Sequence, residues 1–445
     1  MTDPLAPGVE VPGPQQPVTR QPRTQQPGTR RPAARSSGGF YGWRVAGFCT
    51  LLAALTAPGQ TAAVSALINP MIDGLGVSRS TIATCYLIGT LAGAAAMPTV
   101  GRALDRHGAR RTTAVIGAVF AAALFLLSGA TGVVLLTIGF VGIRLAGQGA
   151  LGLAASTTVS RWFTRRRGLV LGLLNAVSAA AISLTPVLLP TLLPSLGWRR
   201  VWAVEAVVVL LVVVPVAWFG LRDLPSDLGQ SPDGDHRVVR ATEPVAEWGA
   251  TRAEALRTPF FWVVAAAAAA SGMLATAVAF HQIDLLGERG FSGAQAAANF
   301  VPQTVAGLLG ALLVGVVVDR ARPSVVLAAP MLLLAGGLVW AVFVNPGWSG
   351  IGFGVVLGTA GGSLRTAEAA ILPKVFGTLH LGAMRGLITA VAVGSTAFGP
   401  VVFAVVREST GGYSAALFGG AVLPLLVAVA AFSVRPPAPA APAPS

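Results

Sequence analysis

Six ionisable side chains interrupt long apolar stretches of this sequence and are the first candidates for chemistry: Arg144, Glu205, His281, Asp284, Arg365 and Glu368. A charged side chain at the depth of a bilayer costs about 2.5–3.5 kcal/mol on insertion scales, so we expect each to face a cavity or a partner. A guanidinium group can hold an anion through two parallel hydrogen bonds, whereas imidazole and carboxylate groups can bind and release protons. These residue types therefore indicate substrate binding at the two arginines and proton coupling at the other four positions.

The two arginines also have structural interpretations. Arg144 lies about midway along an apolar stretch, within Arg-Leu-Ala-Gly-Gln-Gly, and could donate to carbonyl groups of a neighbouring helix made reachable by the glycines. Arg365 and Glu368 stand three positions apart, so they share one face of a helix and could form an internal ion pair. Both alternatives stay open beside anion binding.

The remaining titratable residues also have two interpretations. Glu205 lies about one turn from Arg199 and Arg200 and could pair with them instead of carrying a proton. His281 and Asp284 lie near the end of an apolar stretch, where a carboxylate could favour a protonated imidazole. A solvated helix end without a role is the alternative at this second place.

Uncharged polar residues also interrupt the apolar runs. Four of them are candidates for substrate contact, namely Gln60, Asn175, Asn299 and Gln303. Each could equally hold two helices together through a hydrogen bond, because an amide within a membrane seeks a partner.

A charged segment, residues 101–111, separates two apolar stretches and reads Gly-Arg-Ala-Leu-Asp-Arg-His-Gly-Ala-Arg-Arg. We expect a short loop in which glycines permit tight turns and the aspartate accepts hydrogen bonds from N–H groups at a helix start. The candidate gating residues of this loop are Gly101, Asp105, Arg106, Gly108 and Arg110.

A weaker copy of this segment occurs at residues 315–322, where Gly315, Asp319 and Arg320 keep the spacing of glycine, aspartate and arginine at an offset of 214. Phe163 and Phe376 recur at an offset of 213. Near-constant offsets indicate an internal duplication, so the chain is expected to consist of two related halves. Two such halves facing one another are a transporter architecture with a site between them at the midplane.

The composition is that of a membrane protein. The 445 residues are 54% hydrophobic and 11% charged, against about 25% charged in soluble domains. The formal charge of +14 is interpreted as arginine topology signals and a basic tail rather than as nucleic-acid binding. Cys49 and Cys85 both lie in apolar stretches, so we expect buried thiols and no disulfide.

Twelve stretches are long and apolar enough to span a bilayer. They are residues 43–68, 80–101, 112–129, 131–156, 168–193, 200–221, 258–284, 295–318, 323–343, 348–372, 386–407 and 413–434. The predicted fold is an all-α membrane protein with twelve transmembrane helices in two pseudo-symmetric six-helix bundles. The predicted parts are a disordered tail (1–40), a first bundle (41–221), a linker (222–257), a second bundle (258–434) and a Pro/Ala-rich tail (435–445).

Basic residues are unevenly distributed between the short loops of the two sides. Twelve lie on the side of the 101–111 segment and five on the other side. Because cytoplasmic loops carry the excess of lysine and arginine, we expect both termini and the linker to be cytoplasmic in a multi-pass protein of the cell membrane.

The 101–111 segment closely resembles the loop motif between the second and third helices of the major facilitator superfamily. Within it, the chain is similar to the bacterial branch related to monocarboxylate transporters and oxalate/formate exchangers. The residues that carry this resemblance are Tyr41–Trp43, Arg161–Gly168, Gly197–Arg199, Leu228–Gly234, Thr258–Trp262 and Phe376–Gly386. The resemblance implies a twelve-helix transporter that works by alternating access.

Two departures bear on the substrate. Carboxylate carriers of this branch tend to hold a cation in the eighth or eleventh helix, whereas here the eighth offers Asn299 and Gln303, and no charge lies between Arg385 and Arg407. The glycine–proline motif of drug antiporters is also missing, because Pro186 lacks a preceding glycine.

We therefore expect a secondary transporter, not an enzyme, that moves a monocarboxylate or similar organic anion and is coupled to protons. The alternatives are a proton-coupled exporter of amphipathic compounds and a transport-inactive membrane sensor. The expected partners are a small-molecule substrate, protons and the lipid bilayer, without nucleic acid, and the expected state is a monomer. No cofactor or metal is expected, because no nucleotide-binding loop, nucleophile–base set or metal-ligand cluster occurs.

Overall fold

The computed structural model describes residues 40–234, 249–318, 320–377 and 381–437. The predicted first tail before residue 40, the middle of the predicted linker and Asp319 lie outside this part of the chain. Within it the secondary structure is helical and no strand occurs. The first-half elements are α1 (Gly42–Ala54), η1 (Ala57–Gly59), α2 (Thr61–Leu75), α3 (Arg79–Ser128), α4 (Val133–Ile143), η2 (Arg144–Ala150), α5 (Leu151–Trp162), α6 (Arg167–Pro215) and η3 (Val216–Gly220).

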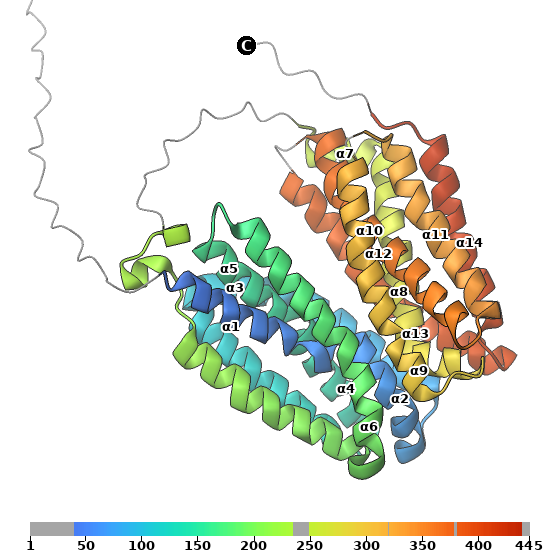
Figure 1. Ribbon diagram of the computed structural model, residues 1–445, viewed down its shortest axis with the longest axis horizontal. Helices are drawn as coiled ribbons and strands as arrows, with labels where there is room; N and C mark the ends of the chain where they lie inside the picture. Colours follow the sequence, from blue (N-terminus) through green and yellow to red (C-terminus); the bar gives the residue numbers. More distant parts are fainter. Residues whose placement is uncertain (1–39, 235–248, 319, 378–380, 438–445) are drawn as a thin grey trace, which may run out of the picture. The chain divides into compact units, whose positions relative to one another are not determined.

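The described ends of the linker contain short helical turns, η4 (Pro225–Leu228) and η5 (Pro232–Gly234), and the short helix α7 (Arg252–Arg257). The second half then follows with its own helices. These are α8 (Pro259–Gly287), α9 (Gly293–Ala298), α10 (Phe300–Val317), α11 (Pro323–Phe343), α12 (Trp348–Phe376), α13 (Leu381–Thr410) and α14 (Ser414–Ser433). Figure 1 shows the first-half helices in blue to green and those of the second half in yellow to red.

Nine helical segments among the described residues are long and apolar enough to cross a membrane. Two of them contain a pair of helices, because α3 turns sharply at Gly108 (φ +80°) and α6 at Gly197 (φ +70°). Helix α12 is long enough to be a further crossing segment, although its glycines and the charges of Arg365 and Glu368 lower its mean hydropathy. The described part of the chain thus has the twelve crossing helices that the sequence predicts.

The sequence predicts one continuous helix over residues 43–68, and this prediction is wrong because the helix is interrupted. The chain breaks after α1 and passes through η1 before α2 begins. Pro58 stands at the start of this turn, where proline fixes φ but cannot donate a backbone hydrogen bond. A Cβ at Gly59 would lie 2.7 Å from the carbonyl oxygen of Ile143 and 2.8 Å from Cα of Gly147, so the break lets the backbone press against the fourth crossing helix.

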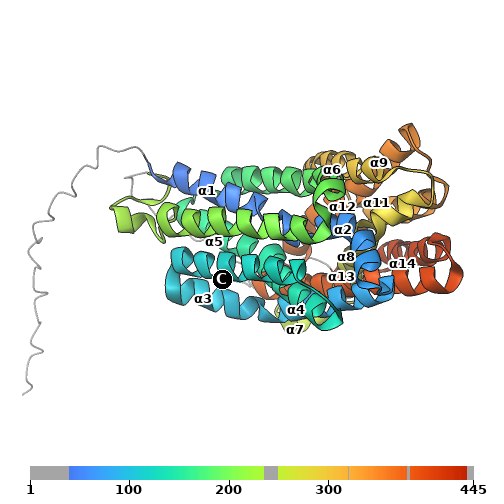
Figure 2. The ribbon, with the colours of Figure 1, turned by 90° about the horizontal axis from the view of Figure 1, so that it is seen from below.

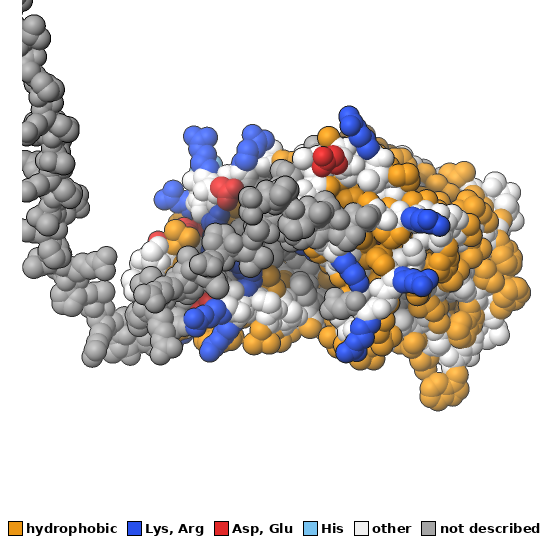
Figure 3. All heavy atoms as spheres, turned by 90° about the horizontal axis from the view of Figure 1, so that it is seen from above, with side chains coloured by type: hydrophobic (Ala, Val, Ile, Leu, Met, Phe, Trp, Pro, Cys, Tyr) orange, Lys and Arg blue, Asp and Glu red, His pale blue; other side chains and the backbone are white. Residues whose placement is uncertain are grey.

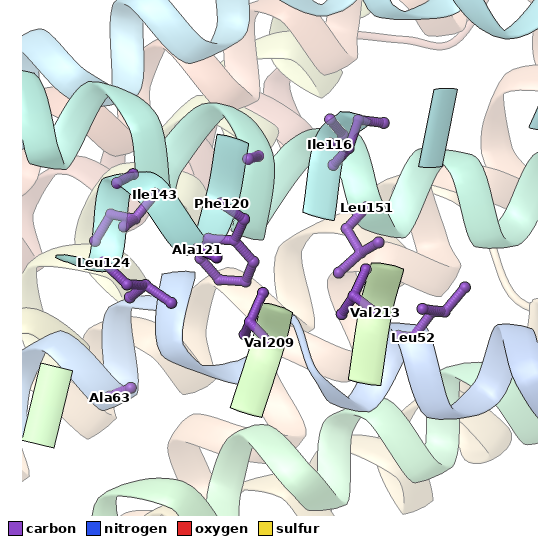
Figure 4. Close-up of a cluster of buried hydrophobic side chains, with 14 of the residues drawn as sticks. Leu52, Ala63, Ile116, Phe120, Ala121, Leu124, Ile143, Leu151, Val209 and Val213 are labelled. Carbon is purple, nitrogen blue, oxygen red and sulfur yellow. The ribbon is translucent and has the colours of Figure 1, made fainter. Parts of the chain in front are cut away.

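Buried apolar side chains form two clusters. The first joins residues from 45 to 221 with Phe280 and Ala404, and the second joins residues from 255 to 431. In the first cluster Phe120 of α3 points toward Val209 of α6 (Figure 4). Each half therefore has its own core, and Phe280 and Ala404 belong to the second half by sequence but pack into the first.

Contacts between the halves follow a few helices only. Helix α2 contacts α8, α3 contacts α13, and α6 contacts α9 and α10. Helices α8 and α13 pack along one another beside α2, as Figures 1 and 2 show from two directions. The side chains that make these contacts, described below, define a candidate site and a closure between the halves.

Candidate functional site

Arg144 is a buried cation within the first half. It begins the π-helical segment η2, and its side chain is 2% exposed. Nε donates to Oγ1 of Thr90 at 3.0 Å, and Nη1 donates to the carbonyl oxygen of Gly59 at 3.3 Å. The remaining nitrogen, Nη2, is buried and has no hydrogen-bond partner among the described residues. The two partners fix the guanidinium while one of its edges stays available to an acceptor.

Tyr86 connects Arg144 to the other half of the chain. The guanidinium carbon of Arg144 lies 4.4 Å from the centroid of the Tyr86 ring, a cation–π arrangement. The ring centroid of Phe280, on α8, lies 4.7 Å from that of Tyr86. The Tyr86 hydroxyl is hydrogen-bonded to Thr61 at 2.6 Å. Tyr86 and Thr90 are not among the residues predicted from the sequence, although their four-residue spacing places them on one helical face.

Gln60 and Asn175 have no hydrogen bond to a side-chain or backbone partner among the described residues through their amides. Gln60 is partly buried and lies between Gly59, which contacts Arg144, and Thr61, which contacts Tyr86. Asn175 lies on α6 and is exposed. Both remain free to contact a solute, and Gln60 is the one placed beside Arg144 by its chain neighbours.

Asn299 and Gln303 are members of an amide cluster that joins helices of the second half. Nε2 of Gln303 donates to Gln282 at 2.8 Å and to Asn299 at 3.0 Å. Nδ2 of Asn299 donates to the carbonyl oxygen of Gly350 at 2.5 Å, and Gln282 donates to that of Ala296 at 3.0 Å. Both predicted residues thus hold α8, α10 and α12 together, and Gln282, missed by the sequence analysis, completes the cluster.

Arg365 and Glu368 do not form the ion pair that their spacing permits. Neither residue has a salt bridge or side-chain hydrogen bond with another described residue. Arg365 is exposed and Glu368 is partly buried on α12. The terminal nitrogens of Arg365 lie 3.6 Å and 3.9 Å from the positions that a Cβ would take at Gly361 and Gly307. Arg365 is therefore an accessible cation beside the contact of α10 with α12.

Glu205 does not pair with the arginines one turn away. Nη1 of Arg199 instead donates to the carbonyl oxygens of Ser128 and Ala130 at 3.3 and 2.5 Å, where the second arm of α3 ends. Arg199 also lies over the Trp198 ring at 4.2 Å. Oε2 of Glu205 is buried without a hydrogen-bond partner among the described residues. The helix-end carbonyls compete successfully for Arg199 because they carry partial negative charge.

His281 and Asp284 are not a solvated helix end. His281 is 1% exposed, and its Nε2 lies 2.9 Å from the carbonyl oxygen of Pro400. The Tyr413 hydroxyl lies 3.0 Å from Nδ1 of His281 and 2.9 Å from Oδ2 of Asp284. Tyr413 thus bridges the two predicted proton-coupling residues. Nothing in the sequence pairs this tyrosine with Asp284, which lies 129 residues before it.

Asp284 also joins the two halves of the chain. Its Oδ1 pairs with Nη2 of Arg79, the first residue of α3, at 3.2 Å, and its Oδ2 pairs with Nε of Arg407 at 2.8 Å. Glu288 lies 3.2 Å from the same Nε of Arg407. Beside this cluster, Glu408 accepts from the backbone N–H of Ser80 at 2.8 Å. We call Arg79, Asp284, Arg407 and Glu288 the closure cluster.

The 101–111 segment at the opposite end is more helical than predicted. Residues 101–107 continue α3, so Gly101 is an ordinary helical residue, and the turn is made by Gly108 alone. Asp105 does not cap the following arm as we expected, because its Oδ1 pairs with Arg161 at 2.8 Å. The cap is Asp223, whose Oδ1 accepts from the backbone N–H of Arg110 at 2.8 Å.

The other gating candidates lie at the surface of this end. Arg106 is exposed, and Arg110 lies over the Trp218 ring at 4.9 Å. In the second-half copy Gly315 is helical and exposed, and Arg320 is exposed. Asp319 falls outside the described residues. Figure 3 shows this face of the molecule, where basic side chains are more prominent than acidic ones.

The start of the linker is fixed to this same end through Asp233. Its carboxylate accepts from the backbone N–H groups of Thr164, Arg165 and Arg166 at 2.9, 2.7 and 3.2 Å. Slight burial raises the pKa of Asp233, but these hydrogen bonds and the charge of Arg166 outweigh it, so the pKa lies below its ordinary value. Asp233 is the one non-glycine residue with positive φ (58°) in the described chain, a strain that the three bonds offset.

A sequence model described as "Major Facilitator Superfamily" matches residues 49–353, more than half of the chain. The chain is 36% identical over 103 residues to "MFS-type transporter hasB" of Aspergillus fumigatus, which is 23% of this chain and 22% of that protein. It is 29% identical over 160 residues to "Uncharacterized MFS-type transporter YcxA" of Bacillus subtilis, which is 35% of this chain and 38% of that protein. Both matches span well under two thirds of the relatives.

Among solved structures, the chain is similar to a bacterial homolog of the human lysosomal transporter Spinster in an inward-facing and unoccupied conformation. The TM-score is 0.70 at 15% sequence identity, and the match covers 89% of this chain and 97% of that one. At this identity the likeness concerns the fold alone.

Proposed function

We propose that this chain, which belongs to the Major Facilitator Superfamily and is a multi-pass secondary transporter rather than an enzyme, carries a small organic anion. We further propose that the anion is a monocarboxylate or a similar acid, and that its movement across the cytoplasmic membrane is coupled to protons. The observation that carries the proposal is the buried Nη2 of Arg144, which has no hydrogen-bond acceptor among the residues that the structure describes.

An anionic substrate supplies the acceptor that Arg144 lacks. Thr90 and Gly59 already hold Nε and Nη1, so the guanidinium is oriented before a ligand arrives. No carboxylate pairs with Arg144 in the described chain. A buried cation without a counter-charge is costly, and a carboxylate ligand lowers that cost through a charge-assisted hydrogen bond. Tyr86 offers an apolar face against which the organic part can pack.

Arg365, in the second half, also supports a negatively charged substrate. It is exposed and has no salt bridge among the described residues. We propose that Arg365 attracts the anion, and that Gln60 and Asn175 offer amide donors and acceptors to it. Glu205 and Glu368 remain candidate proton carriers within the helices.

The contacts between the halves support an inward-facing state. Arg79 pairs with Asp284 and Tyr86 packs on Phe280, whereas no ion pair between the halves occurs at the Asp105 end of the described chain. The similar solved structure has an inward-facing conformation. We propose that the Asp105 end is cytoplasmic, together with both termini, because the basic loops lie there.

Transport into proteoliposomes tests the sign of the substrate. A panel of carboxylates and their uncharged amides is compared for the native chain, Arg144→Lys and Arg144→Ala. We expect acids to be transported and amides not, with Arg144→Lys weakened because lysine lacks the fork, and Arg144→Ala inactive. Arg200→Gln is the control, since Arg200 is exposed. Equal handling of acids and amides, with Arg144→Ala active, contradicts the anion proposal and favours export of amphipathic compounds.

Accessibility of single cysteines tests the orientation. Ser231→Cys and Ala294→Cys are placed in a background with Cys49→Ala and Cys85→Ala, and whole cells are treated with an impermeant thiol reagent. We expect labelling of the Ala294→Cys variant and protection of the Ser231→Cys variant. The reverse pattern would place the Asp105 end outside.

A further inference from the structure

The hydrogen bonds around Tyr413 require one more proton than the surrounding groups ordinarily hold. The carbonyl oxygen of Pro400 can only accept, so Nε2 of His281 must carry a hydrogen. The Tyr413 hydroxyl has a single hydrogen, yet it lies within bonding distance of Nδ1 of His281 and Oδ2 of Asp284. With a neutral imidazole and an ionised carboxylate, one of these two contacts faces lone pair against lone pair.

An added proton satisfies the whole chain of bonds. If Nδ1 of His281 is protonated, it donates to the Tyr413 oxygen, and the Tyr413 hydrogen is then free to bond Asp284. Placing the proton on Asp284 instead would satisfy the same bonds in the opposite direction. Both oxygens of Asp284 already pair with a guanidinium group, Oδ1 with Arg79 and Oδ2 with Arg407, whereas Nδ1 of His281 contacts only the Tyr413 hydroxyl among the described residues, so we place the proton on the imidazole.

Groups around His281 act on this proton in opposite directions. Burial of His281 and the guanidinium groups of Arg79 and Arg407 oppose a positive imidazole. The carbonyl oxygen of Pro400 and the charge of Asp284 favour it. The charged groups in and beside the closure cluster come from several elements, namely Arg79 of α3, Asp284 near the end of α8, Glu288 and Arg289 just after it, and Arg407 and Glu408 of α13. A proton on the imidazole would therefore depend on the positions of both Tyr413 and Asp284.

We propose that His281, Tyr413 and Asp284 form a proton-binding site whose occupancy stabilises contact between the halves at the closure cluster. Asp284 is shared by the proton site and by the Arg79 ion pair, so both depend on the same carboxylate position. Loss of the proton breaks one bond of the chain and loosens Asp284. By linkage, closure at this end becomes more populated as pH falls and less populated as pH rises.

The proton site is connected to the proposed substrate site at Arg144 through Phe280, the residue before His281. Phe280 precedes His281 in the chain and packs on the Tyr86 ring. The guanidinium group of Arg144 stacks over that same ring. Movement of α8 away from the first half therefore disturbs the proton site and the contact between Phe280 and Tyr86 together. This step rests on the proposed anion transport, whereas the proton site itself stands on the hydrogen bonds alone.

Two measurements without substrate test the site. In the first, spin labels at Asp73→Cys and Ser409→Cys, both exposed, report the distance between the halves in lipid nanodiscs from about pH 5 to about pH 8. We expect the closed fraction to rise as pH falls. His281→Gln keeps a donor for Pro400 and an acceptor for Tyr413 without titrating, so it should make the closed fraction independent of pH. The exposed His107→Gln is the matched control.

In the second measurement, nitrogen NMR of histidine-labelled protein follows the imidazole that disappears in His281→Gln. We expect both ring nitrogens of His281 to carry hydrogen in the closed state, and Tyr413→Phe to make protonation at least tenfold weaker. An unchanged pH response in folded His281→Gln, or a neutral His281 throughout the closed state, overturns the proposal. Failure of carboxylate transport, by contrast, leaves both readouts unaffected.

Discussion

Arg79 and Asp284 come from different halves of the chain and form an ion pair at 3.2 Å, with side chains 9% and 16% exposed. Arg79 is held on its own side by Asn69, which accepts from its Nη2 at 2.6 Å. Asp284 is held by Arg407 and Tyr413. Each partner is therefore oriented within its half before the halves meet, so the pair forms and breaks as a unit when they separate.

Removing the charge of Arg79 should open this end. We expect Arg79→Gln to keep a donor for Asn69 but lower the closed fraction about tenfold or more, because Asp284 loses one partner. The double variant Arg79→Gln/Asp284→Asn should open the cluster less than the two single effects predict together, since the residues interact directly. The spin-label distances measure both. Strictly additive effects would show that the pair does not couple the halves.

The two aspartates near Gly108 should behave differently. Asp223→Ala removes the cap of the second arm of α3 and should lower stability by about 1 kcal/mol. Asp105→Asn breaks an exposed pair with Arg161 and should leave the melting temperature nearly unchanged while slowing transport severely. Thermal unfolding in detergent and proteoliposome uptake separate the two effects. Equal destabilisation by both variants would argue against Asp223 as the cap.

The crossing of α10 with α12 should not tolerate a methyl group. A Cβ at Gly362 would overlap the backbone carbonyl of Gly307, and one at Gly358 would overlap that of Gln303. We expect Gly362→Ala to cost about 1–3 kcal/mol as the helices are pushed apart. Gly336→Ala, with nothing within 4 Å of its Cβ position, should be neutral or stabilising. Thermal unfolding of both variants provides the comparison.

The hydrogen bonds by which Asp233 holds the start of the linker should weaken at acid pH. Its pKa is lowered in the folded chain, so its contribution to stability is fully present above the unfolded pKa of about 3.9 and is lost as pH falls through the lower, folded value. We expect amide hydrogen exchange at Thr164–Arg166, corrected for intrinsic rates, to become faster over that range. Asp233→Asn should show fast exchange already at neutral pH. Protection that survives acid would contradict a role for the charge.

The sequence by itself determined the helical crossing segments. Apolar runs of sufficient length force the backbone to satisfy its hydrogen bonds within helices, and that requirement is local. The repeated motif spacing indicated two related halves. The ionisable residues within apolar runs singled out Arg144 and His281, which are buried, and Asp284, which is partly buried.

Only the tertiary structure decided the partners of these residues. Arg199 could reach Glu205 along its own helix but donates to backbone carbonyl groups at the end of α3. The cap of the second arm of α3 is not Asp105 but Asp223, 118 residues further along the chain. Tyr413 meets His281 because α8 and α13 bring distant segments together. Side-chain pairing depends on the packing of helices in three dimensions, and hydrophobic periodicity, which reports only whether a segment is buried, does not specify which neighbour it meets.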